Sequence, residues 1–116
     1  MRIEHYDFGQ IVIDGRSYRQ DLILLPDRVI PRWWRERGHS LSPGDLTDVI
    51  QAQEQVDTLI VGTGAFGLMN VPPETRDYLQ EQGIRLVIKP TASAVEEYNR
   101  RWEEGQRVTA ALHLTC

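Results

Sequence analysis

Residues 57–67, DTLIVGTGAFG, indicate the fold class of this chain more clearly than any other stretch. An apolar strand over residues 59–61 runs directly into a G-x-G-x-x-G pattern formed by Gly62, Gly64 and Gly67. In dinucleotide-binding folds such a turn opens a helix whose free N–H groups face a pyrophosphate. Here four other residues and two prolines come first, and helical patterning begins only at Glu74. The pattern therefore predicts a strand and a tight loop, without the helix that a dinucleotide site requires.

Strands and helices alternate through the rest of the chain, which predicts β-α-β crossovers and helices on the faces of a sheet. The expected elements are strands at residues 59–61, 84–88 and 107–114, a helix beginning at Ser42-Pro43-Gly44-Asp45, and helices at residues 74–82 and 92–104. The apolar residues 86–88 are typical of a strand buried on both faces. The last strand alternates apolar and polar residues, so we expect it to have one less apolar face.

The first third of the chain is predicted to be β structure. Residues 11–13 form a short strand, Asp14-Gly15 supplies a tight turn, and residues 17–25 form the return strand. Prolines then leave room for no more than a short edge strand at residues 28–30. We therefore expect a single α/β domain over residues 1–116, with an additional N-terminal hairpin or small sheet.

Composition indicates a soluble protein. The 116 residues are 41% hydrophobic and 26% charged, with a net charge of −4. The negative charge argues against a dedicated nucleic-acid binder, and no apolar run approaches the roughly 20 residues of a membrane span. Cys116 is the only cysteine, and the first ten residues lack the apolar core of a signal peptide. We therefore expect a cytoplasmic protein without membrane contacts.

The glycine loop has two interpretations. As a ligand site, the backbone N–H groups around Thr63 and Gly64 would cradle a phosphate or another small anion. As a structural device, Gly62 and Gly64 would allow a sharp exit from the strand. Lys89 stands at the end of the next strand, where a dinucleotide site places the acidic residue that holds a ribose. Both interpretations stay open, and neither favours a dinucleotide.

A second group of polar residues follows the next strand. Thr91, or alternatively Ser93, is expected to cap the helix that begins there. Ligands of open α/β sheets bind outside the carboxyl ends of the strands, so the 62–67 and 89–91 loops are expected to share a crevice. Helix N-termini and Lys89 would favour an anion in it. The candidate ligand residues are Gly62, Thr63, Gly64, Gly67, Lys89, Thr91 and Asn99.

Residues 28–39, RVIPRWWRERGH, combine four arginines with two tryptophans. This composition is found in single-stranded nucleic-acid sites and in protein-contact hot spots, and also in ordinary packing with solvated arginines. Adjacent residues of an extended segment point to opposite faces, so we expect one tryptophan in the core and the other as a surface anchor. The candidate protein-contact residues are Arg32, Trp33, Trp34 and Arg35.

No group of residues predicts catalysis. His5, His39 and His113 lie far apart in the sequence and lack the i, i+4 spacing of a metal site. Cys116 has no base beside it in the sequence, and no acid/base pair is recognisable. We therefore expect no catalytic residues, no metal and no cofactor. The hollow expected beside the glycine loop would be rimmed by bare amides and hold no reactive side chain.

The order and spacing of five segments resemble a small family of mostly uncharacterised α/β domains. The segments are IVIDGRSY, LILLPDRV followed by Trp33-Trp34, DTLIVGTG, GIRLVIKPTASAVEEYN and EGQRVTAALHLTC. That family includes a mitochondrial assembly factor for respiratory complex I and an adipogenesis-associated cytoplasmic protein. The resemblance implies a three-layer domain with a central mixed sheet, no established enzymatic activity, and action through protein contacts.

Two functions follow as expectations. The first is a non-enzymatic protein-interaction or assembly domain, monomeric or weakly homodimeric, with an unknown protein partner. The alternative is a protein that binds a small molecule or anion, with or without enzymatic activity, in a pocket between the 62–67 and 89–91 loops. Nucleic-acid binding is a third and weaker interpretation, because phosphate contacts need a positive charge that this chain lacks overall.

Overall fold

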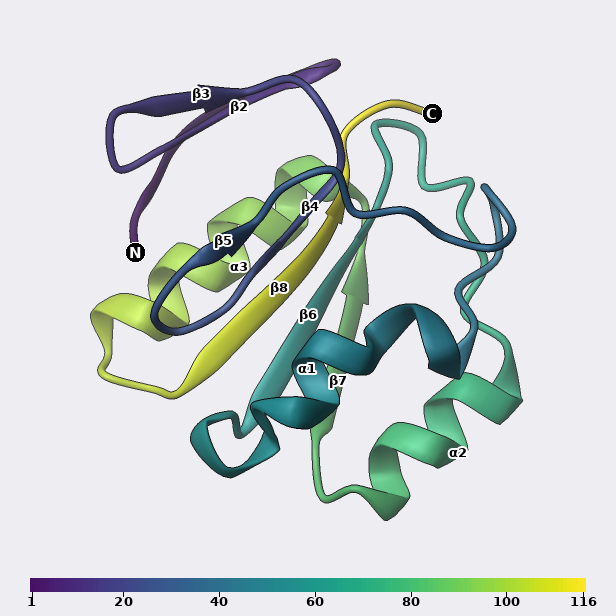
Figure 1. The fold of residues 1–116 in the computed structure, drawn as a ribbon. Coiled ribbons are helices and arrows are strands. Elements are labelled where there is room, and N and C mark those ends of the chain that lie inside the picture. The colour runs from purple at the N-terminus through teal and green to yellow at the C-terminus, as the bar shows by residue number, and fades with distance from the viewer.

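A computed structural model describes all 116 residues, and its strands and helices form three layers (Figure 1). The strands are β1 (Ile3–Asp7), β2 (Gln10–Ile13), β3 (Arg16–Tyr18), β4 (Leu22–Leu24), β5 (Val29–Ile30), β6 (Thr58–Thr63), β7 (Arg85–Lys89) and β8 (Val108–His113). The helices are α1 (Thr47–Gln51), α2 (Pro73–Glu81) and α3 (Thr91–Glu103), with 3-10 turns η1 (Pro43–Leu46) and η2 (Gln53–Gln55).

Five strands form the central mixed sheet, in the order β5-β4-β8-β6-β7. Strand β6 lies between β7 and β8 and runs parallel to both, whereas β4 is antiparallel to β8 and to β5. Strands β1, β2 and β3 form a separate antiparallel sheet. The predicted α/β fold, with a central mixed sheet and an additional N-terminal sheet, is confirmed.

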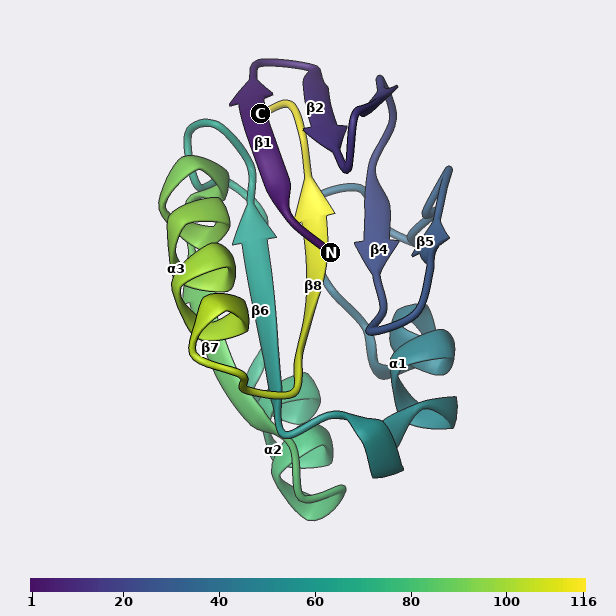
Figure 2. The ribbon, with the colours of Figure 1, turned by 90° about the vertical axis from the view of Figure 1, so that its left-hand side faces the viewer.

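Two apolar cores fill the space on either side of the central sheet. Helix α3 and the three-stranded sheet cover one face, and α1 and α2 cover the other (Figure 2). Side chains of β6 alternate between the two cores, as the pleat of a strand requires. Ile60 packs in the same core as Tyr98 of α3 and Ile11 of β2, whereas Leu59 packs in the same core as Leu79 of α2.

The return strand predicted over residues 17–25 is wrong as one element. The chain forms β3, breaks over residues 19–21, and continues as β4 in the other sheet. The break occurs because Leu22, Ile23 and Leu24 are all fully buried and pair with β8, while β3 pairs with β2 on the surface of the domain. Strand β1 was not predicted, and the short edge strand β5 was.

The order of strands corrects a second prediction. Strand β8, expected to have a less apolar face, is the middle strand, and all six of its residues are buried. Its polar residues are tolerated there because they are paired: Thr109 donates its hydroxyl hydrogen to the Leu24 carbonyl, and His113 has the partners described below. Strand β7, expected to be buried on both faces, is an edge strand with exposed and half-buried residues.

The helices lie close to their predicted positions, since α2 and α3 each begin and end one residue before the expected bounds. The segment after Ser42 begins as η1 and continues as α1. The Ser42 N–H donates to the Asp45 carboxylate at 2.9 Å, which is one half of a capping box. Leu46 and Val49 are fully buried in the core on the face of the sheet that α1 and α2 cover.

Candidate functional site

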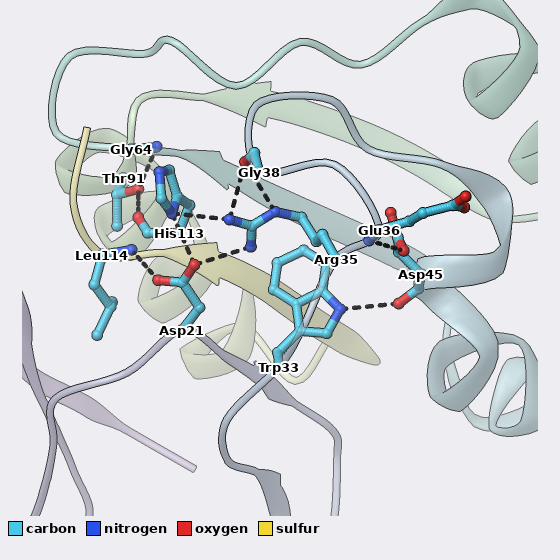
Figure 3. Close-up of polar contacts among 10 residues, drawn as sticks. All are labelled: Asp21, Trp33, Arg35, Glu36, Gly38, Asp45, Gly64, Thr91, His113 and Leu114. Atoms are coloured by element: carbon cyan, nitrogen blue, oxygen red, sulfur yellow. Dashed lines mark hydrogen bonds and ion pairs between the residues drawn. The ribbon is translucent and has the colours of Figure 1, made fainter.

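A histidine–carboxylate pair lies at the carboxyl end of β8, beside the glycine loop (Figure 3). His113 is the last residue of β8, and its Nδ1 lies 2.8 Å from Oδ2 of Asp21, which precedes β4. The other oxygen of Asp21 accepts the Leu114 N–H at 2.7 Å. An ionised carboxylate only accepts hydrogen bonds, so Nδ1 carries the proton and Nε2 of the neutral ring is an acceptor.

Arg35 completes this group, which we name the Asp21–Arg35–His113 cluster. Its Nη1 forms an ion pair with Asp21 Oδ2 at 2.9 Å, and its Nη2 lies 3.2 Å from His113 Nδ1. Nε and Nη2 also donate to the Gly38 carbonyl at 3.2 and 3.1 Å. The guanidinium lies over the Trp33 ring, 4.7 Å from its centroid. One buried cation thus neutralises Asp21 and ties the loop after β5 to the end of β8.

The environment of Asp21 keeps its carboxyl ionised. Burial alone would raise the pKa of Asp21, but the hydrogen bonds from His113 and Leu114 and the contact with Arg35 lower the pKa below its usual value of 3.8. Asp21 therefore carries its negative charge at neutral pH. The cluster is an oriented imidazole, a carboxylate that holds it, and a cation that balances the carboxylate.

The second nitrogen of His113 has no partner. The residue is only 6% exposed, and its Nε2 is buried without a hydrogen bond. The ring lies against Gly64. A Cβ atom added to that glycine would be only 2.9 Å from His113 Cδ2. An unpaired buried acceptor costs about 1–3 kcal/mol. This nitrogen is therefore available to a hydrogen-bond donor that reaches the cluster.

The two predicted loops are neighbours, but they bind each other. The Gly64 N–H donates to Thr91 Oγ1 at 2.9 Å, and the Thr91 N–H donates to the Gly64 carbonyl at 3.0 Å. The Ala65 N–H donates to the Thr115 carbonyl at 2.7 Å, because the segment after β8 passes over the loop. The expectation of bare amides is therefore wrong. The expectation that no reactive side chain lies there is also wrong, since His113 does.

Thr91 does not cap α3 as predicted. Pro90 precedes the helix, and the Thr91 hydroxyl instead donates to the His113 carbonyl at 2.6 Å while it accepts the Gly64 N–H. This hydroxyl joins β6, α3 and β8 at one point, where Thr91 is fully buried. Its role in the structure is to hold the glycine loop against the end of β8.

The other candidate ligand residues have internal partners. Thr63 donates its hydroxyl hydrogen to the Lys89 carbonyl at 3.1 Å, and Lys89 Nζ lies 3.4 Å from the Glu97 carboxylate. Asn99 is placed differently: it accepts the Ile3 N–H at 3.0 Å and donates to the Ile3 carbonyl at 2.6 Å. Asn99 therefore docks β1 onto α3, and as a ligand residue it stays an untested prediction.

The two tryptophans divide as predicted. Trp33 is 8% exposed and donates its indole N–H to the Asp45 carbonyl at 2.9 Å, whereas Trp34 is 82% exposed. Of the two arginines, Arg35 is buried in the cluster and Arg32 is exposed. Arg32 also has a φ of 56°, an uncommon backbone conformation for a residue with a side chain.

Asp21 and His113 were missed by reasoning from the sequence. The usable signal was their position, because Asp21 directly precedes a wholly apolar strand and His113 stands between two leucines. Polar groups at such positions are buried and need partners. The sequence does not tell which polar groups pair, since Asp21, Arg35 and His113 are brought together only by the antiparallel pairing of β4 with β8 and by the loop after β5.

The chain matches the model of a family described as protein of unknown function DUF498/DUF598 over residues 3–113. It belongs to this family. An uncharacterised protein of Rhodobacter capsulatus is 31% identical over 110 residues, which cover 95% of this chain and 82% of that protein. The family assignment thus extends over nearly the whole chain, including all three residues of the cluster.

Solved structures show the same fold in other members of this structural group. A Bartonella henselae protein described as an outer membrane protein is 26% identical with a TM-score of 0.86, and covers 98% of this chain and 94% of its own. A conserved hypothetical protein of Pyrococcus horikoshii is 28% identical with a TM-score of 0.82, with full coverage of both chains. In the structure described here, no helix is both long and apolar enough to cross a membrane.

Proposed function

We propose that this DUF498/DUF598 domain is a cytoplasmic, non-enzymatic protein-interaction or assembly domain whose contact surface is centred on Trp34. The observation that carries the proposal is the exposure of Trp34, at 82%, between two residues that are each 8% exposed. Tryptophan and arginine are enriched among the residues that dominate protein interfaces. The resemblance to a family with a complex I assembly factor and an adipogenesis-associated protein supports the same kind of function.

The backbone that presents Trp34 is held on both sides. Trp33 donates its N–H to the Asp21 carbonyl at 2.8 Å and its indole N–H to Asp45, and Arg35 is fixed by Gly38 and by the cluster. A side chain on such a backbone loses little conformational entropy when a partner covers it. We infer that the Asp21–Arg35–His113 cluster serves this presentation, by locking the segment from which Trp34 projects.

Trp34→Ala is expected to abolish capture of the partner and to leave the domain folded. The free energy of unfolding should change by no more than about 0.5 kcal/mol, because the side chain is mostly in solvent. The measurement is affinity purification of tagged protein from the native host, followed by mass spectrometry, alongside thermal unfolding. Trp102→Ala is the matched control, since Trp102 is an exposed tryptophan on α3. Equal capture by wild type and Trp34→Ala would refute the proposal.

A second candidate function is the binding of a small molecule or anion where the 62–67 and 89–91 loops meet. It is favoured by the buried, unpartnered Nε2 of His113, which lies against Gly64. A neutral imidazole there would accept a hydrogen bond from a ligand, and a protonated one would donate to an anion. Because Gly64 and Thr91 already bind each other, the ligand would have to displace the loop.

Under this second candidate, inorganic phosphate should raise the midpoint of thermal unfolding, because a ligand that binds only the folded protein stabilises it. His113→Gln should remove this increase, whereas His5→Gln, on the exposed strand β1, should keep it. The measurement is a thermal shift series with increasing phosphate at constant pH. A wild-type midpoint that does not respond to phosphate would eliminate the anion-binding form of this candidate.

A further inference from the structure

A groove of about 480 Å³ lies between the three-stranded sheet and the end strand of the central sheet. One wall comes from β3 and the residues that follow it, and the other from β5 and the residues that follow it. We name it the β3–β5 groove and define it by Arg16, Ser17, Arg19, Val29 and Arg32. It is separate from the Asp21–Arg35–His113 cluster, none of whose residues lines it.

The charge of this groove is opposite to that of the whole chain. Arg16, Arg19 and Arg32 are all exposed, and no acidic residue lines the groove. None of the three arginines forms an ion pair in the structure, whereas six other arginines do. In a chain of net charge −4, three free cations in one groove make it selective for negative charge.

Both walls of the groove also present unpaired strand edges. Strand β3 pairs only with β2, and β5 pairs only with β4. Ile13 and Arg16 are partners across a two-residue turn, and in such a hairpin the residues that flank the turn form the hydrogen-bonded pair. The backbone of the next residue, Ser17, is therefore expected to point away from β2. Likewise the Leu25 N–H donates to the Arg28 carbonyl, so the backbone of Val29 points away from β4. Free donors and acceptors of this kind accept an added strand.

The geometry points to an acidic, extended polypeptide segment of a partner as the occupant of the β3–β5 groove. Its backbone pairs with a free edge, and its carboxylates lie against the three arginines. This inference rests on the interaction function proposed above and adds the chemistry of the partner. Arg32 links the β3–β5 groove to the contact surface centred on Trp34, because it lines the groove and stands two residues before Trp34.

A peptide fits these observations better than a nucleic acid does. Strand edges recognise a polypeptide backbone, which a nucleic acid lacks. Single-stranded nucleic acid needs a series of stacking aromatic side chains, and Tyr18 is the only aromatic residue in the groove, where Arg16 already lies 5.7 Å from the centroid of its ring. The overall negative charge of the chain further opposes a polyphosphate.

The test is fluorescence anisotropy with a labelled eight-residue peptide of alternating glutamate and valine, at 50 mM and 300 mM salt. We expect binding that weakens at the higher salt. Exchange of Arg16 and Arg19 for glutamate together should lower the affinity by about tenfold or more. Arg85→Glu is the matched control, because Arg85 is exposed, forms no ion pair and lies on β7 at the opposite edge of the sheet. The affinity of this variant for the peptide should stay within about twofold of the wild-type affinity.

Three further probes separate the occupants. A lysine–valine peptide tests charge, a glutamate–valine peptide methylated at every backbone nitrogen tests strand pairing because it cannot donate to an edge, and an oligo(dT) tests nucleic acid. The inference stands if only the unmethylated glutamate–valine peptide binds well. It is overturned if no peptide binds, if the methylated peptide binds equally, if the oligonucleotide binds tighter, or if sedimentation shows that the groove arginines hold a second copy of this chain.

These outcomes are distinguishable from failure of the proposed function. Capture of a partner that is lost in Trp34→Ala but kept in the Arg16→Glu, Arg19→Glu double variant would leave the interaction function intact and overturn the acidic-peptide inference. Circular dichroism and thermal unfolding of the double variant confirm that it is folded, which is expected because both arginines are exposed.

Discussion

Gly64→Ala is expected to lower the free energy of unfolding by about 3–5 kcal/mol, the largest effect of any single methyl group added to this chain. Gly64 has a φ of +105°, which residues with side chains rarely adopt. A Cβ atom there would also lie 2.7 Å from the Thr115 carbonyl oxygen, 2.8 Å from the Cys116 carbonyl oxygen and 2.9 Å from His113 Cδ2. Two of these neighbours are backbone, so relief requires the end of the chain to move.

Gly105→Ala separates the effect of the positive φ from the effect of the close contacts. Gly105 has a φ of +81° with nothing within 4 Å of an added Cβ, so this variant measures the backbone conformation without the close contacts. We expect it to lose only about 1–2 kcal/mol. The measurement for both variants is urea unfolding followed by circular dichroism. If the two glycines tolerated alanine equally, the packing of the chain end onto the glycine loop would be wrong.

Reasoning from the sequence found the elements of this fold more reliably than their order in the sheet. The strand at residues 59–61 and the helices predicted at residues 74–82 and 92–104 depend on local rules, and the structure confirms them to within one residue at each helix end. The position of β8 in the middle of the sheet depends on which polar residues find partners. The partner of Thr109 is the Leu24 carbonyl on the neighbouring strand, and the partner of His113 is Asp21, which precedes that strand. A local sequence pattern does not predict these pairings.

The sequence predicted that the two loops lie together, but not the residues that surround them. The expected meeting of the glycine loop with the start of α3 is confirmed by the hydrogen bonds between Gly64 and Thr91. The chain end and His113 occupy the space that we expected to be a hollow. The chain end and His113 lie there because β8 runs parallel to β6, which the G-x-G-x-x-G pattern does not encode.

Asp21→Ala is expected to lower the free energy of unfolding by about 3–5 kcal/mol, because it leaves the Arg35 guanidinium buried without its counter-charge. It also removes the acceptor of the Leu114 N–H and of the His113 ring. The measurement is urea unfolding at pH 7. Exchange of Arg35 for leucine in the same chain should recover part of the loss, since the unpaired buried charge is then gone.

Asp57→Ala is the matched control, because Asp57 forms a two-bond ion pair with Arg107 on the surface. Solvent screens that pair, so its loss should have a much smaller effect on unfolding. Equal losses from the two aspartates would show that Asp21 does not balance a buried charge on Arg35, as the structure describes. Partner capture by the Asp21→Ala, Arg35→Leu chain then reports whether the cluster is needed to present Trp34.

The contribution of Asp21 to the free energy of unfolding should decrease as the pH falls. Its pKa in the folded state lies below the unfolded value near 3.8, so the folded protein holds this proton less tightly than the unfolded chain does. The stabilisation is therefore fully present above about pH 5 and is lost as the pH falls through the folded pKa. The difference in unfolding free energy between wild type and Asp21→Asn should shrink from pH 6 to pH 3. A difference that stayed constant, or grew, over this range would show that Asp21 is not held as an ionised carboxylate by His113, Leu114 and Arg35.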